Sequence, residues 1–397
     1  MNIRKLTPEE YRISDKLASL SFVFPLPEEK KEAAEADAYQ SDRWGCFDEA
    51  GHTAAVLFNN DLPIWFDHGI APARGVGNVA SDPVSRGHGY VRALFQHVLA
   101  DDYKAGVLFS VLYPFSHPFY RKFGYELCLD GVTASFPTDA LKIFRTDNQF
   151  QARMLLPGDG LEALHPLYTA YAKQYNMAVA RDARTWKRIK LGDPYKAEQY
   201  CYVLSRNGRD TGYVIFRFRP KERPYNRILC LIDYAFADKQ AFYDLMSFLH
   251  RFSSEGQDVE MFVPGNLPLS ALLQEPYDIT TGSFSRPMAR AVRVEKVLEA
   301  LRHPKDNGTY SVYIEDPFLP ANEGCYRVRY AKDGAVSVTR CEGDADLRVS
   351  VQTFTQLALG VLSLEQAAYK SDVQINGNEE TLRQVFVQKP VFLWDFY

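Results

Sequence analysis

Residues 79–99 read Val-Ala-Ser-Asp-Pro-Val-Ser-Arg-Gly-His-Gly-Tyr-Val-Arg-Ala-Leu-Phe-Gln-His-Val-Leu and join an apolar strand, through a polar loop, to an amphipathic helix. The loop turns through Arg86, Gly87, His88 and Gly89, and the helix is predicted to begin near Tyr90. A glycine-containing turn at a helix N-terminus directs unpaired backbone N–H groups and the positive end of the helix dipole at one spot. Arg86 adds a permanently charged donor set. The stretch therefore predicts a pyrophosphate cradle and a phosphorylated cofactor.

Composition narrows the class of protein. The chain has 397 residues, enough for two or three domains, and a formal net charge of −4 without any long run of Lys and Arg. This balance argues against nucleic acid or a membrane surface as partner. The polar N-terminal residues and the lack of a long apolar run predict a cytoplasmic protein without a signal peptide or membrane span. Six cysteines without metal-type spacing are interpreted as unpaired, buried residues in a reducing compartment.

Three successive patterns organise the chain. Apolar segments at 44–48, 53–59, 62–70 and 75–79, then a helix at 90–101 and a strand at 106–113, predict an α/β domain with a crossover in a mixed sheet. The same order returns between residues 200 and 263, but the strand-to-helix junction there is Phe236-Ala237-Asp238-Lys239, without glycine and with a carboxylate that repels phosphate. We interpret this as a degenerate internal duplication. The last segment alternates strands and helices as a small α+β domain.

Two motifs in the first domain carry the chemistry. Arg86-Gly87-His88-Gly89-Tyr90-Val91 resembles the acyl-CoA pyrophosphate loop of GNAT N-acetyltransferases, Arg/Gln-x-x-Gly-x-Gly/Ala, except that Val91 replaces the final small residue. The run Phe119-Tyr120-Arg121-Lys122-Phe123-Gly124-Tyr125 resembles the Tyr-x-x-x-Gly-Tyr/Phe segment that follows the next strand of GNAT domains. A buried loop aromatic is the plainer interpretation of Tyr120. The two motifs together favour the GNAT interpretation.

The three-part layout resembles the Eis family of acetyltransferases. That resemblance implies an active GNAT domain at 1–135, a degenerate GNAT domain at 136–281 and a sterol-carrier-protein-like domain at 282–397. Supporting segments are 168–186 in the middle domain, Pro287-Met288-Ala289-Arg290-Ala291-Val292 in the last, and the aromatic end Pro390-Val-Phe-Leu-Trp-Asp-Phe-Tyr397. An aromatic terminus is expected to be buried, because free ends are normally polar and frayed.

The resemblance also assigns roles. Tyr120 is expected to be the general acid, and the terminal carboxylate of Tyr397 the general base. The cofactor, acetyl-CoA, is expected to lie against Val79, Ala80, Ser81, Arg86, Gly87, His88, Gly89, Tyr90, Val91, Arg92, Phe115 and Ser116. An alkylammonium has a pKa of about 10.4, so a base must remove a proton before attack on the thioester. A C-terminal carboxylate starts at a pKa of about 3.3–3.7, and burial would raise it. Anchoring of the domains alone is the plainer role for Tyr397.

Other candidate site residues have weaker support from the sequence. His88 and His117 flank the motifs without any metal-ligand spacing, so no metal is expected. Phe24, Trp44 and Trp65 can line an amine cleft by cation–π contact, although each is more often plain core. We predict an acetyl-CoA-dependent N-acetyltransferase that acts on a primary amine, such as an aminoglycoside-like polyamine or a lysine side chain, through a ternary complex. The family also implies a homo-oligomer, a hexamer or smaller. The alternatives are an apolar-ligand carrier and an idle acyl-CoA sensor on the same scaffold.

Overall fold

The computed structural model describes residues 1–26, 41–67, 69–128, 131–147, 149–222, 225–282, 287–393 and 395. Within these, the chain forms two compact units. One unit takes in residues 1–128, 287–389 and 395, and the other takes in residues 131–282 and 390–393. Residues 28–38, whose mixed acidic and basic sequence predicts a helical segment, lie outside the described residues. We describe each unit by itself.

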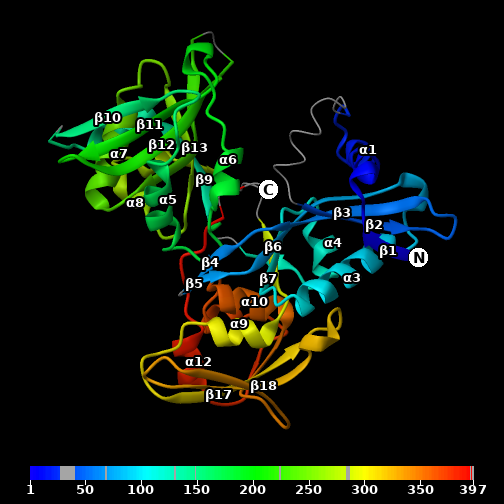
Figure 1. The fold of residues 1–397 in the computed structure, drawn as a ribbon. Coiled ribbons are helices and arrows are strands. Elements are labelled where there is room, and N and C mark those ends of the chain that lie inside the picture. Colours follow the sequence, from blue (N-terminus) through cyan, green and yellow to red (C-terminus); the bar gives the residue numbers. More distant parts are fainter. Residues whose placement is uncertain are drawn as a thin grey trace. The chain divides into compact units, whose positions relative to one another are not determined.

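The first unit contains a seven-stranded mixed sheet of order β1-β2-β3-β6-β7-β16-β8 (Figure 1). Its strands are β1 Asn2–Lys5, β2 Ser41–Phe47, β3 Thr53–Asp61, β6 Ala73–Ser81, β7 Phe109–Leu112, β16 Met288–Ala291 and β8 Glu126–Leu127. The pairs β1–β2, β2–β3 and β3–β6 are antiparallel, whereas β6 and β7 run parallel. A parallel pair needs a crossover, which is supplied by helix α3, Tyr90–Lys104. The predicted α/β domain with a mixed sheet is confirmed.

Side-chain alternation places helices on both faces of this sheet. Ala55 and Leu57 of β3 join the core cluster of α3, while Val56 between them joins a second cluster with α1, Tyr11–Phe22. On α3 the fully buried apolar side chains recur at helical spacing, which is the pattern that predicted the helix. They are Leu94, Phe95, Val98 and Leu99. The sheet is therefore a central layer, with α3 packed on one face and α1 on the other.

Two segments of the first unit differ from the sequence expectation. Residues 62–70, expected as one strand, form a hairpin of β4, Ile64–Phe66, and β5, Gly69–Ala71. Asp67 in its turn has φ 47°, a left-handed conformation that ends an extended run. Residues 288–291, expected within the last domain, form β16 between β7 and β8. The first sheet is thus completed by a strand that follows the whole second domain in sequence.

The second unit repeats the plan in a sheet of order β10-β11-β12-β13-β14-β9-β15. Its strands are β9 Val132–Pro137, β10 Phe150–Leu155, β11 Tyr200–Arg206, β12 Arg209–Pro220, β13 Arg227–Phe236, β14 Asp258–Val263 and β15 Thr280–Gly282. Its helices are α5 Leu164–Ala172, α6 Ala183–Arg188, α7 Lys239–His250 and α8 Leu269–Leu272. An antiparallel meander, β11 to β13, again leads through a helix, α7, into a parallel strand, β14. The predicted internal duplication is therefore visible in the topology.

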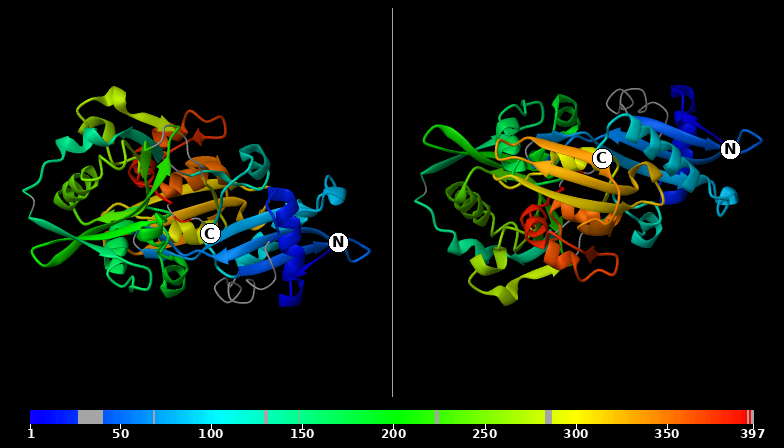
Figure 2. Two further views of the ribbon diagram at one scale, coloured as in Figure 1. Left: turned by 90° about the horizontal axis from the view of Figure 1, so that it is seen from above. Right: turned by 90° about the horizontal axis from the view of Figure 1, so that it is seen from below.

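The C-terminal part of the first unit is a small α+β domain, as predicted. Its sheet, of order β19-β18-β17-β20-β21, is drawn in yellow and orange in Figures 1 and 2. The strands are β17 Gly308–Glu315, β18 Gly324–Tyr330, β19 Val336–Cys341, β20 Leu347–Ser350 and β21 Gln374–Ile375. The helices are α9 Val294–Ala300, α10 Val351–Leu359, α11 Leu364–Ala367 and α12 Glu379–Val385.

The expectation that all six cysteines are unpaired is wrong for two of them. Cys325 and Cys341 are directly opposite in β18 and β19 and form a disulfide. Their separation of 16 residues shows no motif, because the pairing depends on strand register, which the spacing of cysteines does not encode. The other four, Cys46, Cys128, Cys201 and Cys230, are free and buried, as expected.

Candidate active site

Strands β6 and β7 separate before β6 ends. Their pairing runs from Ala73 opposite Phe109 to Val76 opposite Leu112, while β6 continues to Ser81. Opposite β3, the register shifts between Val56 and Phe58, and Asn78 of β6 takes a left-handed φ of 46°. Such a bulge adds a residue and turns the strand. Beyond Val76, β6 has no strand partner on its β7 side within the described residues, so its backbone there is not paired with β7.

A cavity of about 680 Å³ lies at this separation. It takes in the end of β6, the turn before α3, the end of α1 and the segment around helix α4, His117–Arg121. The lining residues are Ser21, Phe22, Val79, Ala80, Ser81, Ser85, Arg86, Gly87, Gly89, Tyr90, Val91, Arg92, Phe115, Phe119, Lys122 and Phe123. Ten of the twelve residues expected at the cofactor are among them. The other two, His88 and Ser116, do not line the cavity.

The turn before α3 has the form of an anion cradle. Gly87 and Gly89 have φ of 84° and 82°, and a Cβ on either would meet no atom within 4 Å. Glycine is therefore required here by backbone conformation and not by crowding within the protein. The first intrahelical bond is donated by Ala93 N to Gly89 O at 3.0 Å, so the N–H groups of the three preceding residues lie ahead of the hydrogen-bonded ladder. These donors and the helix dipole favour a negative group at this turn.

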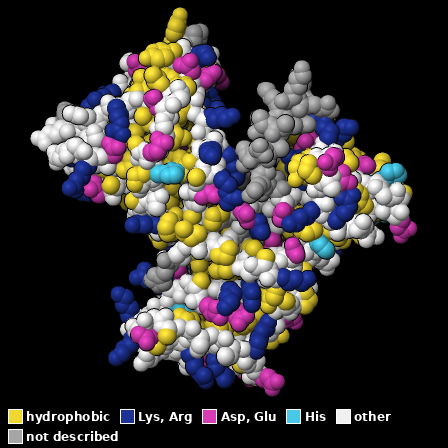
Figure 3. Space-filling view, viewed as in Figure 1, with side chains coloured by type: hydrophobic (Ala, Val, Ile, Leu, Met, Phe, Trp, Pro, Cys, Tyr) yellow, Lys and Arg dark blue, Asp and Glu magenta, His cyan; other side chains and the backbone are white. Residues whose placement is uncertain are grey.

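Three cations line the same cavity: Arg86, Arg92 and Lys122. All three are exposed, and the Arg92 guanidinium lies 5.1 Å from the ring of Phe318. This donor set suits the several phosphates of a CoA molecule, since phosphate is bound by arginine forks and lysine point charges. On the face shown in Figure 3, by contrast, basic and acidic side chains are mixed. Lys122 was missed from the sequence, although it lies two residues after Tyr120.

The loop histidines have local roles in the described structure. His88 Nδ1 lies 3.2 Å from Ser85 O, a contact within the turn. His117 begins the short helix α4, with Ser116 preceding it. No cluster of three or more potential metal ligands occurs among the described residues.

Tyr120 lies on α4 beside the cavity. It is 3 % exposed, and its ring contacts two aromatic residues of the cavity, Phe115 and Phe119, with centroids at 5.5 and 5.1 Å. No hydrogen bond of its hydroxyl occurs within the described part of the chain. Burial raises the pKa of Tyr120 above its usual value, so the hydroxyl is protonated at neutral pH. That is the state a proton donor needs.

The carboxyl-terminal segment is buried in its apolar stretch, 391–393, whereas Pro390 is exposed and Asp395 is half-buried. Val391, Phe392 and Leu393 are 2–3 % exposed, so the expected burial of the apolar end holds for these three residues. Within the first unit, the Tyr113 hydroxyl at the end of β7 donates a hydrogen bond to Asp395 O at 3.1 Å. Tyr397, the expected base, lies outside the described residues.

The aromatic residues expected to line an amine cleft do not form a group. Trp44 belongs to the core cluster on the α3 side of the sheet, where its ring contacts His97 at 5.2 Å. Trp65 lies in the β4–β5 hairpin, and Phe24 follows α1 with 39 % of its surface exposed. For Trp44 the plainer interpretation, a core residue, is the one observed.

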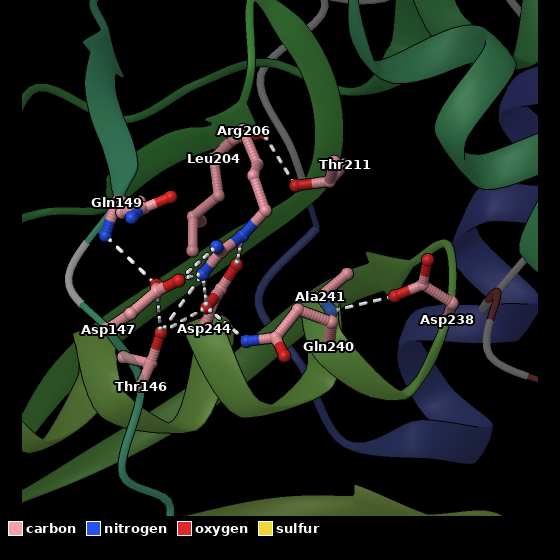
Figure 4. Close-up of polar contacts among 10 residues, drawn as sticks. All are labelled: Thr146, Asp147, Gln149, Leu204, Arg206, Thr211, Asp238, Gln240, Ala241 and Asp244. Atoms are coloured by element: carbon pink, nitrogen blue, oxygen red, sulfur yellow. Dashed lines mark hydrogen bonds and ion pairs between the residues drawn. The ribbon is translucent and has the colours of Figure 1, made fainter.

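At the corresponding junction of the second domain, the chain's own side chains make the polar contacts (Figure 4). Asp238 caps α7 by accepting a hydrogen bond from Ala241 N at 2.9 Å, so a carboxylate occupies the place of an anion. Farther along α7, buried Asp244 is paired with Arg206 at 2.8 Å. Between the separating strands β13 and β14, the Tyr234 hydroxyl donates to Phe262 O at 2.8 Å. The second copy thus uses its own groups where the first leaves backbone and space for a ligand.

Comparisons with known proteins match three parts of the chain to family models. Residues 2–128 and 177–294 match two family models that are both described as acetyltransferase (GNAT) domain, and residues 294–394 match the sterol carrier protein domain. An uncharacterized N-acetyltransferase of Streptomyces avermitilis is 27% identical over 309 residues, 74% of this chain and 73% of that protein.

Several solved structures match the chain along its whole length, including these two. A conserved protein of unknown function from Enterococcus faecalis V583, described as a probable N-acyltransferase, is 25% identical with a TM-score of 0.87, and the match covers 100% of this chain and 99% of that one. Eis1 from Mycobacterium abscessus is 19% identical with a TM-score of 0.82 and full coverage of both chains. None of the helices described here is long and apolar enough to cross a membrane.

Proposed function

Because the chain belongs to the GNAT family of N-acetyltransferases, as an Eis-like member with tandem acetyltransferase domains and a sterol-carrier-protein-like domain, we propose that it transfers acetyl from acetyl-CoA directly to a primary amine. GNAT domains use acyl-CoA and a small acceptor; the acetyl donor and the amine are the proposed part. The observation that carries the proposal is the cavity at the separation of β6 and β7, which joins free strand backbone to a cationic glycine turn.

The lining of this cavity supports coenzyme A as its ligand. The turn at Gly87 and Gly89, with Arg86, Arg92 and Lys122, would hold the phosphates. The backbone of Val79 to Ser81 would pair with the extended pantetheine arm in the place that β7 has left. When bound, the cofactor supplies an acetyl group activated as a thioester. Oriented backbone N–H groups on β6 are suited to stabilise negative charge that develops on the acetyl oxygen.

Proton transfer is assigned to two groups of the chain. Tyr120, kept protonated by burial, would give its proton to the departing thiolate, whose thiol has a pKa of about 8.5. The carboxylate of Tyr397 would take the proton of the attacking ammonium, directly or through a water. We further propose the cytoplasm as location and a homo-oligomer, a hexamer or smaller, as assembly.

A thiol-release assay with acetyl-CoA tests the proposal. The panel consists of aminoglycosides, polyamines and lysine peptides, and the product is checked for an amide by mass spectrometry. We expect amine-dependent release, lost in Tyr120→Phe and in a chain extended beyond Tyr397. Near-normal rates in both variants would show that the acid and the base are wrongly assigned. Binding of acetyl-CoA without release by any amine would favour the sensor.

A further inference from the structure

The strand β16 brings an arginine into the core of the first domain. Arg290 is fully buried and lies opposite Ser110 of β7, in a strand that also pairs with β8 just after the Tyr120 segment. Burial of a guanidinium is costly unless every donor finds a partner. Here Nη1 donates to Phe123 O at 2.5 Å, Nη2 to Asp316 Oδ2 at 2.5 Å and Nε to Ala291 O at 3.3 Å.

The carboxylate of the pair is held just as completely. Asp316, also fully buried, accepts from Leu319 N and from Asn322 Nδ2, each at 3.0 Å. Asn322 in turn donates to Val292 O at 3.0 Å and accepts from Val294 N at 3.1 Å. The C-terminal domain therefore fixes the position of the guanidinium whose other end bonds the first domain.

The acceptor Phe123 O belongs to the turn that carries Tyr120. Phe123 N donates to Tyr120 O at 2.9 Å and Tyr125 N donates to the same oxygen at 3.4 Å. Gly124 between them has φ 84°, and a Cβ there would come within 2.7 Å of Arg290 Nη1. The guanidinium therefore bonds one carbonyl of this turn, Phe123 O, and lies close against the glycine that follows it.

We propose that the Arg290–Asp316 pair positions Tyr120 for proton transfer, so that the C-terminal domain sets the geometry of the acid in the first domain. The inference rests on the proposed role of Tyr120. Arg290 acts through the peptide of Phe123 and is a positioning residue. Two further side chains of the C-terminal domain also donate to backbone carbonyls of the first domain. Gln352 Nε2 of α10 donates to Arg121 O at 3.2 Å, and Gln356 Nε2 donates to Leu127 O at 2.9 Å.

The test uses Arg290→Lys in the full chain, because an ammonium can meet Asp316 or Phe123 O but has no fork to hold both. We expect kcat to fall at least tenfold while the Kd of acetyl-CoA changes less than threefold. In a Tyr120→Phe background the same change should add less than a twofold loss, since it acts through the absent hydroxyl. The control is Arg206→Lys at the buried Asp244 of the second domain, which should leave kcat within twofold.

A second readout does not need turnover. Amide hydrogen exchange at residues 123–125 should become at least tenfold faster in Arg290→Lys, with exchange along α3 unchanged. If Arg290→Lys does not fold, Gly124→Ala displaces the guanidinium without removing it, and Gly106→Ala, with a similar φ of 79° and only one distant contact, is its control.

The outcomes separate the two proposals. Full activity of Tyr120→Phe would refute the acid and leave the exchange result to judge the positioning of the turn. Loss of activity in Tyr120→Phe with independent, multiplicative losses in the double variant, or unchanged exchange at residues 123–125, would overturn the role of Arg290 alone.

Discussion

Replacing Gly89 by alanine separates the cost to the protein from the cost to its ligand. Gly89 is the residue directly before α3, its N-cap, with φ 82°, and an added Cβ meets nothing within 4 Å. Gly89→Ala should therefore lower the free energy of unfolding only by the cost of a left-handed backbone, about 1–2 kcal/mol. Each kcal/mol lowers Tm by roughly 2–4 °C in a unit of this size. The methyl group instead fills space where a phosphate would approach the backbone. Loss of one charged hydrogen bond, about 1.5–3 kcal/mol, raises the Kd of CoA roughly ten- to hundredfold.

Gly51 provides the matched control. Its φ is 81°, its added Cβ also meets nothing within 4 Å, and it is not among the residues that line the cavity. Gly51→Ala should lower Tm as much as Gly89→Ala does and leave the Kd of CoA unchanged. Calorimetry measures both quantities on each variant. Equal Kd values for the two variants would refute the idea that the Gly89 backbone approaches the ligand.

Three other variants test separate parts of the structure. Tyr120→Phe removes a hydroxyl that has no hydrogen bond in the described part of the chain, so Tm should stay within about 2 °C while kcat falls about 10²–10⁴-fold; a kcat within threefold of wild type would exclude it as the acid. Asp102, buried on α3, has its pKa raised by burial to about 7 and accepts from Asn59 Nδ2 at 2.9 Å. The folded state therefore holds this proton more tightly than the unfolded state, and stability falls as pH rises from about 4 to 7. Asp102→Asn should flatten this fall and stabilise the chain at pH 8, by at most about 4 kcal/mol; an unchanged pH profile of denaturant unfolding would contradict it. Reducing the Cys325–Cys341 disulfide, which closes a loop with a sequence separation of 16, should lower the unfolding free energy by about 3 kcal/mol, and Cys341→Ser should abolish the effect of reductant; equal Tm with and without reductant would contradict this.

Local signals in the sequence were sufficient for the elements that form the cradle. The apolar run of β3 and the helical spacing of apolar residues in α3 predicted both elements within a few residues. The glycine turn was predicted because Gly87 and Gly89 stand between an apolar strand and the start of a helix, and the structure gives both residues a positive φ. The aspartate at the second junction was predicted to exclude phosphate, and Asp238 is observed as a helix cap.

Long-range pairing could not be predicted in this way. β16 is four residues long and has an arginine in its interior, so it resembles an exposed linker until its neighbours β7 and β8 are known. The burial of Arg290 depends on Asp316, which lies 26 residues later in the sequence, in the C-terminal domain. The cysteine pair depends in the same way on the register of β18 and β19. Lys122 was missed because only the fold brings α4 to the glycine turn.

The central claim is that one of the two acetyltransferase domains, the first, holds the cofactor. Titration of the whole chain with acetyl-CoA by isothermal calorimetry tests it most directly. We predict one site per chain, with a Kd that rises at least tenfold in Gly89→Ala and stays unchanged when Asp238, the cap of α7, is replaced by Asn. Two sites per chain, or binding that Gly89→Ala does not weaken, would contradict the account.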